Sequence, residues 1–261
     1  MRGVGVDGLP GWVTLLRAPN PGPMTLDGTN TWVLRAPGAD EAVVIDPGPQ
    51  DDAHLADIAA HAPVSSILIT HGHHDHVEGA AKLSRLLGGV PVRAAAAQLC
   101  LHGEALAPGV LAEAGLEIEV LATPGHTADS VCFLTNEAVF TGDTILGRGT
   151  AVVAWPDGDL GAYLRTLEVL SAYSRMVLPG HGPVLPDCGE IARAYLAHRR
   201  ERLAQVREAV ANGADTPDSV VDAVYRDIDP AVRFAAVWSA RAQLEFLRRE
   251  SQPGPEQLDP L

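Results

Sequence analysis

The sequence is poor in the features that would place a protein in a membrane or outside the cell. It contains no run of 18 apolar residues, which a membrane-spanning helix would need. Residues 1–8 lack the continuous apolar stretch of a secretory signal peptide. Cysteine occurs only three times, at scattered positions, and an odd number so placed does not suggest a disulfide framework. These absences predict a cytoplasmic protein with no membrane partner.

Positive charge is also scarce. The chain has 19 basic residues against 33 acidic ones, a formal net charge of −14. Because nucleic-acid binding depends largely on neutralising phosphates, this balance argues against a general polyanion-binding protein. Residues 191–210 are a local exception, with five arginines against two glutamates (5 − 2 = +3). That run is either a solvated helix face or a patch that faces a ligand, and both interpretations stay open.

The densest group of polar side chains is the segment 70–79, Thr-His-Gly-His-His-Asp-His-Val-Glu-Gly, which follows an apolar, strand-like run. His71 and His73 are two apart in an extended segment, so their side chains project to the same side. Asp75 and His76 follow as the chain turns and can face a second ion. Since imidazole and carboxylate are the usual ligands of catalytic zinc, the pattern predicts a metal site.

Three further donors follow strand-like runs later in the chain: His126, Asp143 and His181. Each stands beside a glycine, where the backbone can pass close to an ion. A single Gly-His or Gly-Asp pair is weak evidence, because it is more often only a turn. Together with the first segment, however, these residues supply seven donors, enough for two ions that share a carboxylate. His74 lies outside this spacing, and we expect it to be exposed or to support a ligand.

The ordered set resembles the metallo-β-lactamase superfamily of metal-dependent hydrolases. The resemblance implies two divalent ions per chain, one held by His71, His73 and His126, the other by Asp75, His76 and His181, with Asp143 bridging both. Zinc is favoured by the histidine-rich set, although His/Asp sites accept iron and manganese too. Cys100, Cys132 and Cys188 lie off the motif and are expected to be small buried or partly buried residues rather than ligands.

A narrower resemblance is visible at two places. Residues 20–32, with Asn-Pro-Gly-Pro and Gly-Thr-Asn-Thr, look like the opening of the lactamase-β-like 2 subgroup, and residues 147–152 are similar to it as well. The resemblance extends from about residue 15 to 250. The same opening segment also suits a turn-rich lead into a hairpin, and a turn can form the rim of an active site.

The remaining pattern predicts a chain of mixed α and β structure. Strands are expected at 42–45, 90–96, 118–122, 130–135 and 138–141, and helices at 52–62, 77–87 and 161–172. The resemblance makes this an α+β fold, a four-layer αββα sandwich over residues 1–188. Past residue 189 the pattern turns helical, with Thr216-Pro217 and Asp229-Pro230 as helix starts. We predict a helical, winged-helix-like subdomain at 189–250 and a disordered tail at 251–261.

Charge chemistry then predicts the activity. Two divalent ions lower the pKa of the water between them, so hydroxide forms near neutral pH and attacks a carbonyl carbon or phosphorus. Asp75 is the candidate for proton handling. We expect a hydrolase of a small cytoplasmic ester, thioester or lactone, with the C-terminal helices and rim loops choosing the substrate. The lactamase-β-like 2 resemblance implies an alternative, an endoribonuclease that cleaves single-stranded RNA. A non-hydrolytic metal or redox scaffold is a remote third.

Overall fold

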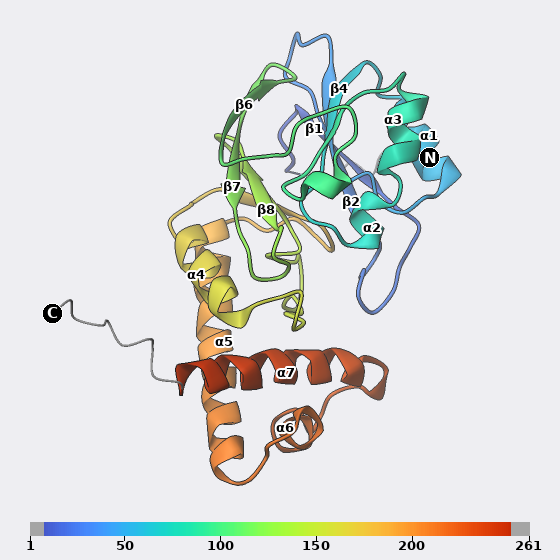
Figure 1. Ribbon diagram of the computed structural model, residues 1–261. Coiled ribbons are helices and arrows are strands. Elements are labelled where there is room, and N and C mark those ends of the chain that lie inside the picture. The colour runs from blue at the N-terminus through green and yellow to red at the C-terminus, as the bar shows by residue number, and fades with distance from the viewer. Residues whose placement is uncertain (1–7, 252–261) are drawn as a thin grey trace, which may run out of the picture.

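The computed structural model describes residues 8–251, and two five-stranded sheets form its centre (Figure 1). The first sheet has the order β1 (Val13–Arg17), β2 (Asn30–Leu34), β3 (Ala42–Ile45), β4 (Val64–Leu68) and β5 (Val92–Arg93). The second has the order β10 (Met176–Pro179), β9 (Ala138–Gly142), β8 (Val131–Leu134), β7 (Leu116–Ala122) and β6 (Gly109–Glu113). Each sheet combines antiparallel pairs with parallel ones, namely β3–β4, β4–β5 and β9–β10.

Helices cover the outer faces of both sheets. Along the first sheet run α1 (Asp52–Ala59), α2 (His74–Val77) and α3 (Ala80–Leu86), with the short 3₁₀ turn η1 (Ala97–Leu99) after β5. The second sheet is covered by α4 (Leu160–Leu170) and the start of α5 (Cys188–Ala211). Helices α6 (Pro217–Val224) and α7 (Arg233–Glu250), joined by the 3₁₀ turn η2 (Pro230–Val232), complete the described chain.

Three apolar clusters correspond to the three interfaces between these layers. Trp32 of β2 and Phe140 of β9 meet edge to face between the sheets, with ring centroids 6.0 Å apart. On the outer face of the first sheet, Val33 packs with residues of α1 and α3. On the outer face of the second sheet, Val139 packs with α4 and α5. Because neighbouring strand residues point to opposite faces, these central strands are apolar on both sides. The predicted αββα sandwich is confirmed.

The sequence-based prediction was wrong at two places in the first half of the chain. The strand expected over 90–96 is only Val92–Arg93, because the chain leaves the sheet and turns into η1. The helix expected over 77–87 is two pieces, α2 and α3, separated at Glu78 and Gly79. Helix α2 therefore begins inside the histidine motif, so one helical turn carries Asp75 and His76.

The C-terminal region is helical from Cys188 to Glu250 apart from its connections, and no strand occurs between residues 188 and 251. Thr216 caps α6 as expected, and it also forms a capping box with Ser219. Asp229-Pro230 starts the short η2 turn, and α7 begins only at Arg233. A fourth apolar cluster, built on Val206, joins α5, α6 and α7. Figure 1 shows α7 crossing beside the sandwich rather than stacking on either sheet. The tail predicted to be disordered lies, beyond Ser251, outside the described residues.

No helix between residues 8 and 251 combines the length and apolar character needed to cross a membrane.

Candidate metal centre

All seven predicted donors come from strand ends at one edge of the sandwich. His71 and His73 follow β4, and α2, which comes next, carries Asp75 and His76. The second sheet contributes the other three: His126 after β7, Asp143 directly after β9, and His181 after β10. The two sheets therefore meet at this edge with polar side chains, where elsewhere they meet with apolar ones.

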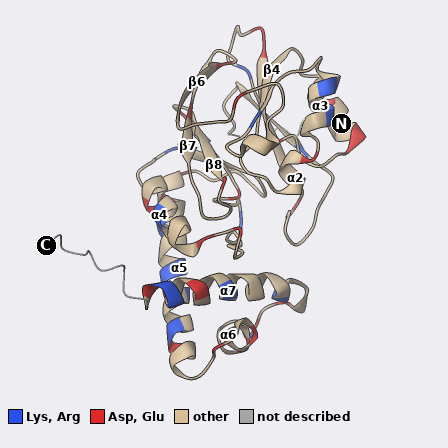
Figure 2. Cartoon of the chain, in the orientation of Figure 1, with Lys and Arg blue, Asp and Glu red and all other residues tan. Residues whose placement is uncertain are grey.

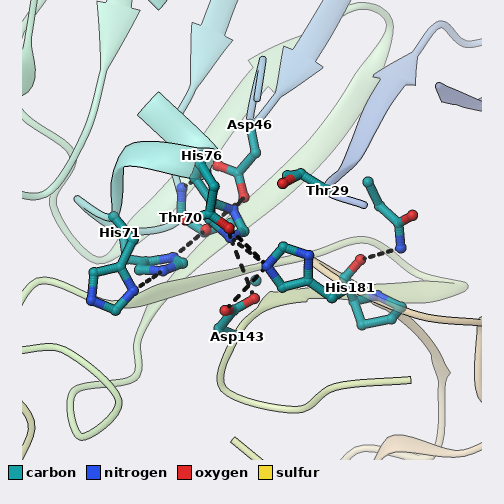
Figure 3. Close-up of polar contacts among 12 residues, drawn as sticks. Thr29, Asp46, Thr70, His71, His76, Asp143 and His181 are labelled. Carbon is teal, nitrogen blue, oxygen red and sulfur yellow. Dashed lines mark hydrogen bonds and ion pairs between the residues drawn. The ribbon is translucent and has the colours of Figure 1, made fainter. Parts of the chain in front are cut away.

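The donors form two groups, each with its ligand atoms within 4.8 Å of one another. The first group contains His71, His73, His126 and Asp143, and the second contains Asp75, His76 and His181. Asp143 lies close to the second group too, with Oδ1 3.4 Å from His76 Nε2 and Oδ2 3.4 Å from His181 Nε2. Figure 3 shows His76 and His181 pointing toward Asp143.

The outward-facing ring nitrogens of these histidines have partners that fix each ring. His76 Nδ1 lies 2.8 Å from Asp46 Oδ2, and His126 Nδ1 lies 2.7 Å from the Val152 carbonyl. His181 Nδ1 lies 3.3 Å from the Gly28 carbonyl. Because these partners accept hydrogen bonds, we assign the proton of each ring to Nδ1. Nε2 then turns a lone pair inward, as metal-binding histidines do.

His71 follows the same rule through Thr70. The Thr70 hydroxyl donates to Asp46 Oδ2 at 2.7 Å, so it accepts from His71 Nδ1, which is 3.0 Å away. His73 differs, since its Nδ1 faces inward and its Nε2 lies 3.3 Å from Asp157 Oδ2. His73 is also the most exposed of the five rings and stands at the mouth of the site.

Two contacts in this arrangement fit a bound cation. The inward nitrogens approach one another closely, at 3.0 Å for His71 Nε2 to His73 Nδ1 and 3.2 Å for His76 Nε2 to His181 Nε2. Two lone pairs at such a distance repel unless a positive charge lies between them. In addition, Asp143 Oδ1 is buried and has no hydrogen-bond partner among the described residues. A buried carboxylate oxygen without a donor is costly, and a divalent ion removes that cost.

The charges of the site point the same way. Burial alone would lower the pKa of His76, but Asp143 and Asp46 outweigh it and hold that pKa well above its ordinary range. The pKa of His181 is raised to about 9, against burial, by Asp143 and Asp75. The carboxylates therefore attract positive charge to this group. Divalent ions held there would supply that charge while the imidazoles stayed neutral, as metal binding requires.

The first group differs in its electrostatics. Burial, and then the neighbouring His76, hold the pKa of His71 well below its ordinary value. Burial likewise lowers the pKa of His126. Both rings are neutral near pH 7, which is the state in which imidazole donates its lone pair to a metal.

Asp46 is the residue that the sequence-based prediction missed. It was not among the seven predicted donors, yet it is 1% exposed and contacts both Thr70 and His76. Its φ of 51° is unusual for a residue other than glycine and turns its carboxylate toward the motif. The signal that could have found it was an aspartate directly after a wholly apolar strand. His74, as expected, is exposed.

Gly180 shows why a glycine precedes His181. A Cβ at this position would lie 2.5 Å from Asp143 Oδ1 and 2.7 Å from His76 Cε1. Real Cβ atoms do not approach other atoms so closely, so any side chain here would displace a donor. The glycine is thus part of the site's construction.

Comparisons with known proteins agree with this geometry. Residues 24–105 match the family model described as the metallo-beta-lactamase superfamily. The chain is 31% identical to a protein of Drosophila melanogaster named "Beta-lactamase-like protein 2 homolog", over 89% of this chain and 86% of that protein. It is 34% identical to the "Atrochrysone carboxyl ACP thioesterase" of Aspergillus fumigatus, over 88% and 79% respectively.

Solved structures share the fold. A beta-lactamase domain protein from Burkholderia ambifaria superposes with a TM-score of 0.78 and 22% identity, over 94% of this chain and 90% of that one. A metallo-beta-lactamase family protein from Thermus thermophilus gives a TM-score of 0.75 at 22% identity, over 92% and 94%.

The chain therefore belongs to the metallo-beta-lactamase superfamily, and it is a hydrolase whose fold implies divalent metal ions. Within that superfamily its resemblance to the lactamase-beta-like 2 relatives is confirmed by the similarity to the Drosophila protein.

Proposed function

We propose that this protein is a two-metal hydrolase of small acyl thioesters. His71, His73 and His126 would hold one ion, Asp75, His76 and His181 the other, and Asp143 both. The observation that carries the proposal is the pair of donor groups that share Asp143, with imidazole lone pairs turned inward in each. Zinc is the expected metal because of the histidine-rich ligands, and iron or manganese are the alternatives. Bound there, divalent ions supply an activated water and Lewis acidity at the attacked carbonyl.

The protein's own side chains would then handle the proton and exclude bulk water. The Asp75 side chain is 28% exposed and its Oδ2 lies 3.0 Å from His181 Nε2. Burial would raise the pKa of Asp75, but the contact with His181 outweighs it and lowers the pKa. The carboxylate is therefore ionised near neutral pH and can accept a proton at the mouth of the site. His71, His76 and His181 are almost fully buried, which keeps the rest of the site dry.

Thioesters are favoured among the candidate substrates by the relatives. Two similar proteins carry the name "Atrochrysone carboxyl ACP thioesterase", one 34% identical from Aspergillus fumigatus and one 32% identical from Aspergillus chevalieri. Esters and lactones present the same carbonyl chemistry to the same donors. We therefore rank thioesters first and keep esters and lactones in the same class.

The RNA alternative gains no support from the arginines of α5. Three of the five arginines are already bound to other groups of the protein. Arg193 donates to the Ser171 carbonyl, Arg200 pairs with Glu168, and Arg207 pairs with Glu250. Figure 2 shows their blue bands along α5, interspersed with acidic residues there and on α7. A phosphate-binding track would need guanidiniums that are free and aligned.

A hydrolysis panel tests the proposal. Metal-loaded protein would be assayed with acyl thioesters, a homoserine lactone, nitrocefin and a short single-stranded RNA, at several salt concentrations. We expect thioester hydrolysis, about two ions per chain by elemental analysis, and loss of both in His76→Ala. His74→Ala is the matched control, since it changes an exposed histidine of the same helical turn. RNA cleavage at nanomolar enzyme with a steep salt dependence would reverse the ranking. Fewer than one ion per chain would refute the metal assignment.

A further inference from the structure

A cavity of about 220 Å³ lies between the sandwich and the C-terminal helices, next to the metal centre. Its walls come from the loop before β2, from residues 150–152 after β9, and from helices α5 and α7. Val152, one of its lining residues, is also the residue whose carbonyl accepts the hydrogen bond of His126. The cavity and the first donor group therefore both contact Val152.

Two arginines give this cavity its charge. Arg199 is only 6% exposed, donates to the Ala151 carbonyl, and stands 5.3 Å from the ring centroid of Tyr163. Arg202 donates to the Val224 carbonyl at 2.9 Å and stacks on Tyr225 at 4.6 Å. Neither guanidinium has a carboxylate partner among residues 8–251, unlike Arg200 and Arg207 on the same helix.

Arg199 also has a polar atom without a partner. Its Nε is buried and makes no hydrogen bond within the described chain. A buried, uncompensated guanidinium is costly, because burial removes the water that would otherwise solvate it. No aspartate or glutamate lines the cavity in the part of the chain that the structure describes. The pKa of His198, a further lining residue, is lowered by burial and then by the two arginines. His198 is therefore uncharged near neutral pH, and the two arginines carry the positive charge of the cavity.

The rest of the lining is largely apolar. Met24 from the loop before β2 and Ala235 and Ala236 from α7 are among the apolar lining residues. At the neighbouring surface of α7, Phe234 and Trp238 are 40% and 44% exposed and meet edge to face. The cavity is smaller than a typical ligand pocket of about 300–1,000 Å³, so it suits one arm of a substrate.

We propose that this cavity binds an oxyanion, a carboxylate or a phosphate, carried by the substrate whose thioester lies at the metal centre, with Arg199 and Arg202 as its positively charged partners. The inference rests on the proposed function for the position of the thioester. A planar guanidinium binds a carboxylate or phosphate through two parallel hydrogen bonds, and apolar walls strengthen that attraction by excluding water. The protein would thus select acyl thioesters that carry negative charge on the acyl arm or on the thiol arm, despite its own charge of −14.

Direct binding provides the first test. S-methyl coenzyme A carries phosphates and a blocked thiol, and monomethyl glutarate carries one carboxylate. Each would be titrated calorimetrically into the full-length, metal-loaded protein and into Arg202→Gln, Arg202→Lys and the control Arg200→Gln. We expect one of the two ligands to bind, its affinity to fall about tenfold or more in Arg202→Gln, and Arg202→Lys to recover part of the loss. Arg200→Gln should bind like the unchanged protein.

Kinetics identify the arm that carries the charge. S-acetyl-4′-phosphopantetheine compared with S-acetylpantetheine isolates phosphate on the thiol arm. Glutaryl- compared with pentanoyl-N-acetylcysteamine isolates a carboxylate on the acyl arm. We expect Arg202→Gln to raise KM for the charged member of one pair several-fold more than KM for its neutral member.

The two hypotheses fail in different ways. If neither ligand binds, or if Arg202→Gln binds both as tightly as the unchanged protein, the anion pocket is refuted, whatever the thioester activity. If no thioester is hydrolysed, the proposed function fails, while the calorimetric result still decides whether the cavity binds anions.

Discussion

Replacing Asp46 by asparagine should weaken the second donor group while sparing the first. The two carboxylate oxygens of Asp46 accept three hydrogen bonds, from Thr70 N at 2.8 Å, Thr70 Oγ1 at 2.7 Å and His76 Nδ1 at 2.8 Å. An asparagine that keeps its oxygen on Thr70 N presents its NH₂ group to the other two. His76 must then move its proton to Nε2, where that proton points at the ion position.

The expected size of the effect follows from these contacts. Loss of the group that orients a metal-binding histidine weakens metal affinity by about 10- to 100-fold. Leaving a buried donor unpaired lowers the free energy of unfolding by about 1–3 kcal/mol. His71 should be spared, because the Thr70 hydroxyl, 3.0 Å from His71 Nδ1, has a second lone pair that can accept from the new amide.

The assay is a competition titration of metal-free protein with zinc and a chromophoric chelator, which resolves the affinities of the two ions. Asp40→Asn, a change at an aspartate in the loop between β2 and β3, outside the metal centre, is the control and should leave both affinities unchanged. If Asp46→Asn kept the wild-type affinity for the second ion, or weakened both ions equally, the orienting role argued for Asp46 would be wrong.

Three further outcomes are expected. Asp143→Asn should lower turnover on a verified substrate by orders of magnitude, since it removes the charge shared by both donor groups; wild-type turnover would contradict the bridging role. Gly180→Ala should lower the free energy of unfolding by about 1–3 kcal/mol and reduce metal content, because its Cβ would lie 2.5 Å from Asp143 Oδ1. Gly11→Ala, with open space around it, is the control and should change neither quantity. Burial lowers the pKa of His54 from its ordinary 6.5. As the pH falls, the unfolded chain therefore takes up a proton on His54 near pH 6.5, before the folded protein does. Chemical denaturation should show the free energy of unfolding decreasing below pH 6.5. Above pH 6.5 His54 should have no effect on it. His54→Gln should flatten that slope, and an unchanged slope would show that another group causes it.

Which side chains the fold brings together at the candidate metal centre could be predicted from local sequence. The spacing of His71, His73, Asp75 and His76 after an apolar run is a local pattern, and later donors each follow an apolar run that became a strand. Such strands can be recognised from their own residues, because the apolar pattern is the same whichever strand pairs with them. The predicted helix starts at Thr216 and Asp229 were local for the same reason, although the second became a 3₁₀ turn.

The surroundings of those donors depend instead on how distant segments pack. Asp46 joined the site because β3 lies beside β4, a pairing that places its carboxylate against Thr70 and His76 across 24 and 30 residues of chain. Packing also decided which arginines of the arginine-rich run have carboxylate partners. Arg200 and Arg207 found carboxylates, while Arg199 and Arg202 came to line a cavity without one. The helical period determines which residues share a face of a helix. The charged groups that this face contacts belong to elements distant in sequence, and only the packing of the fold brings them to the helix.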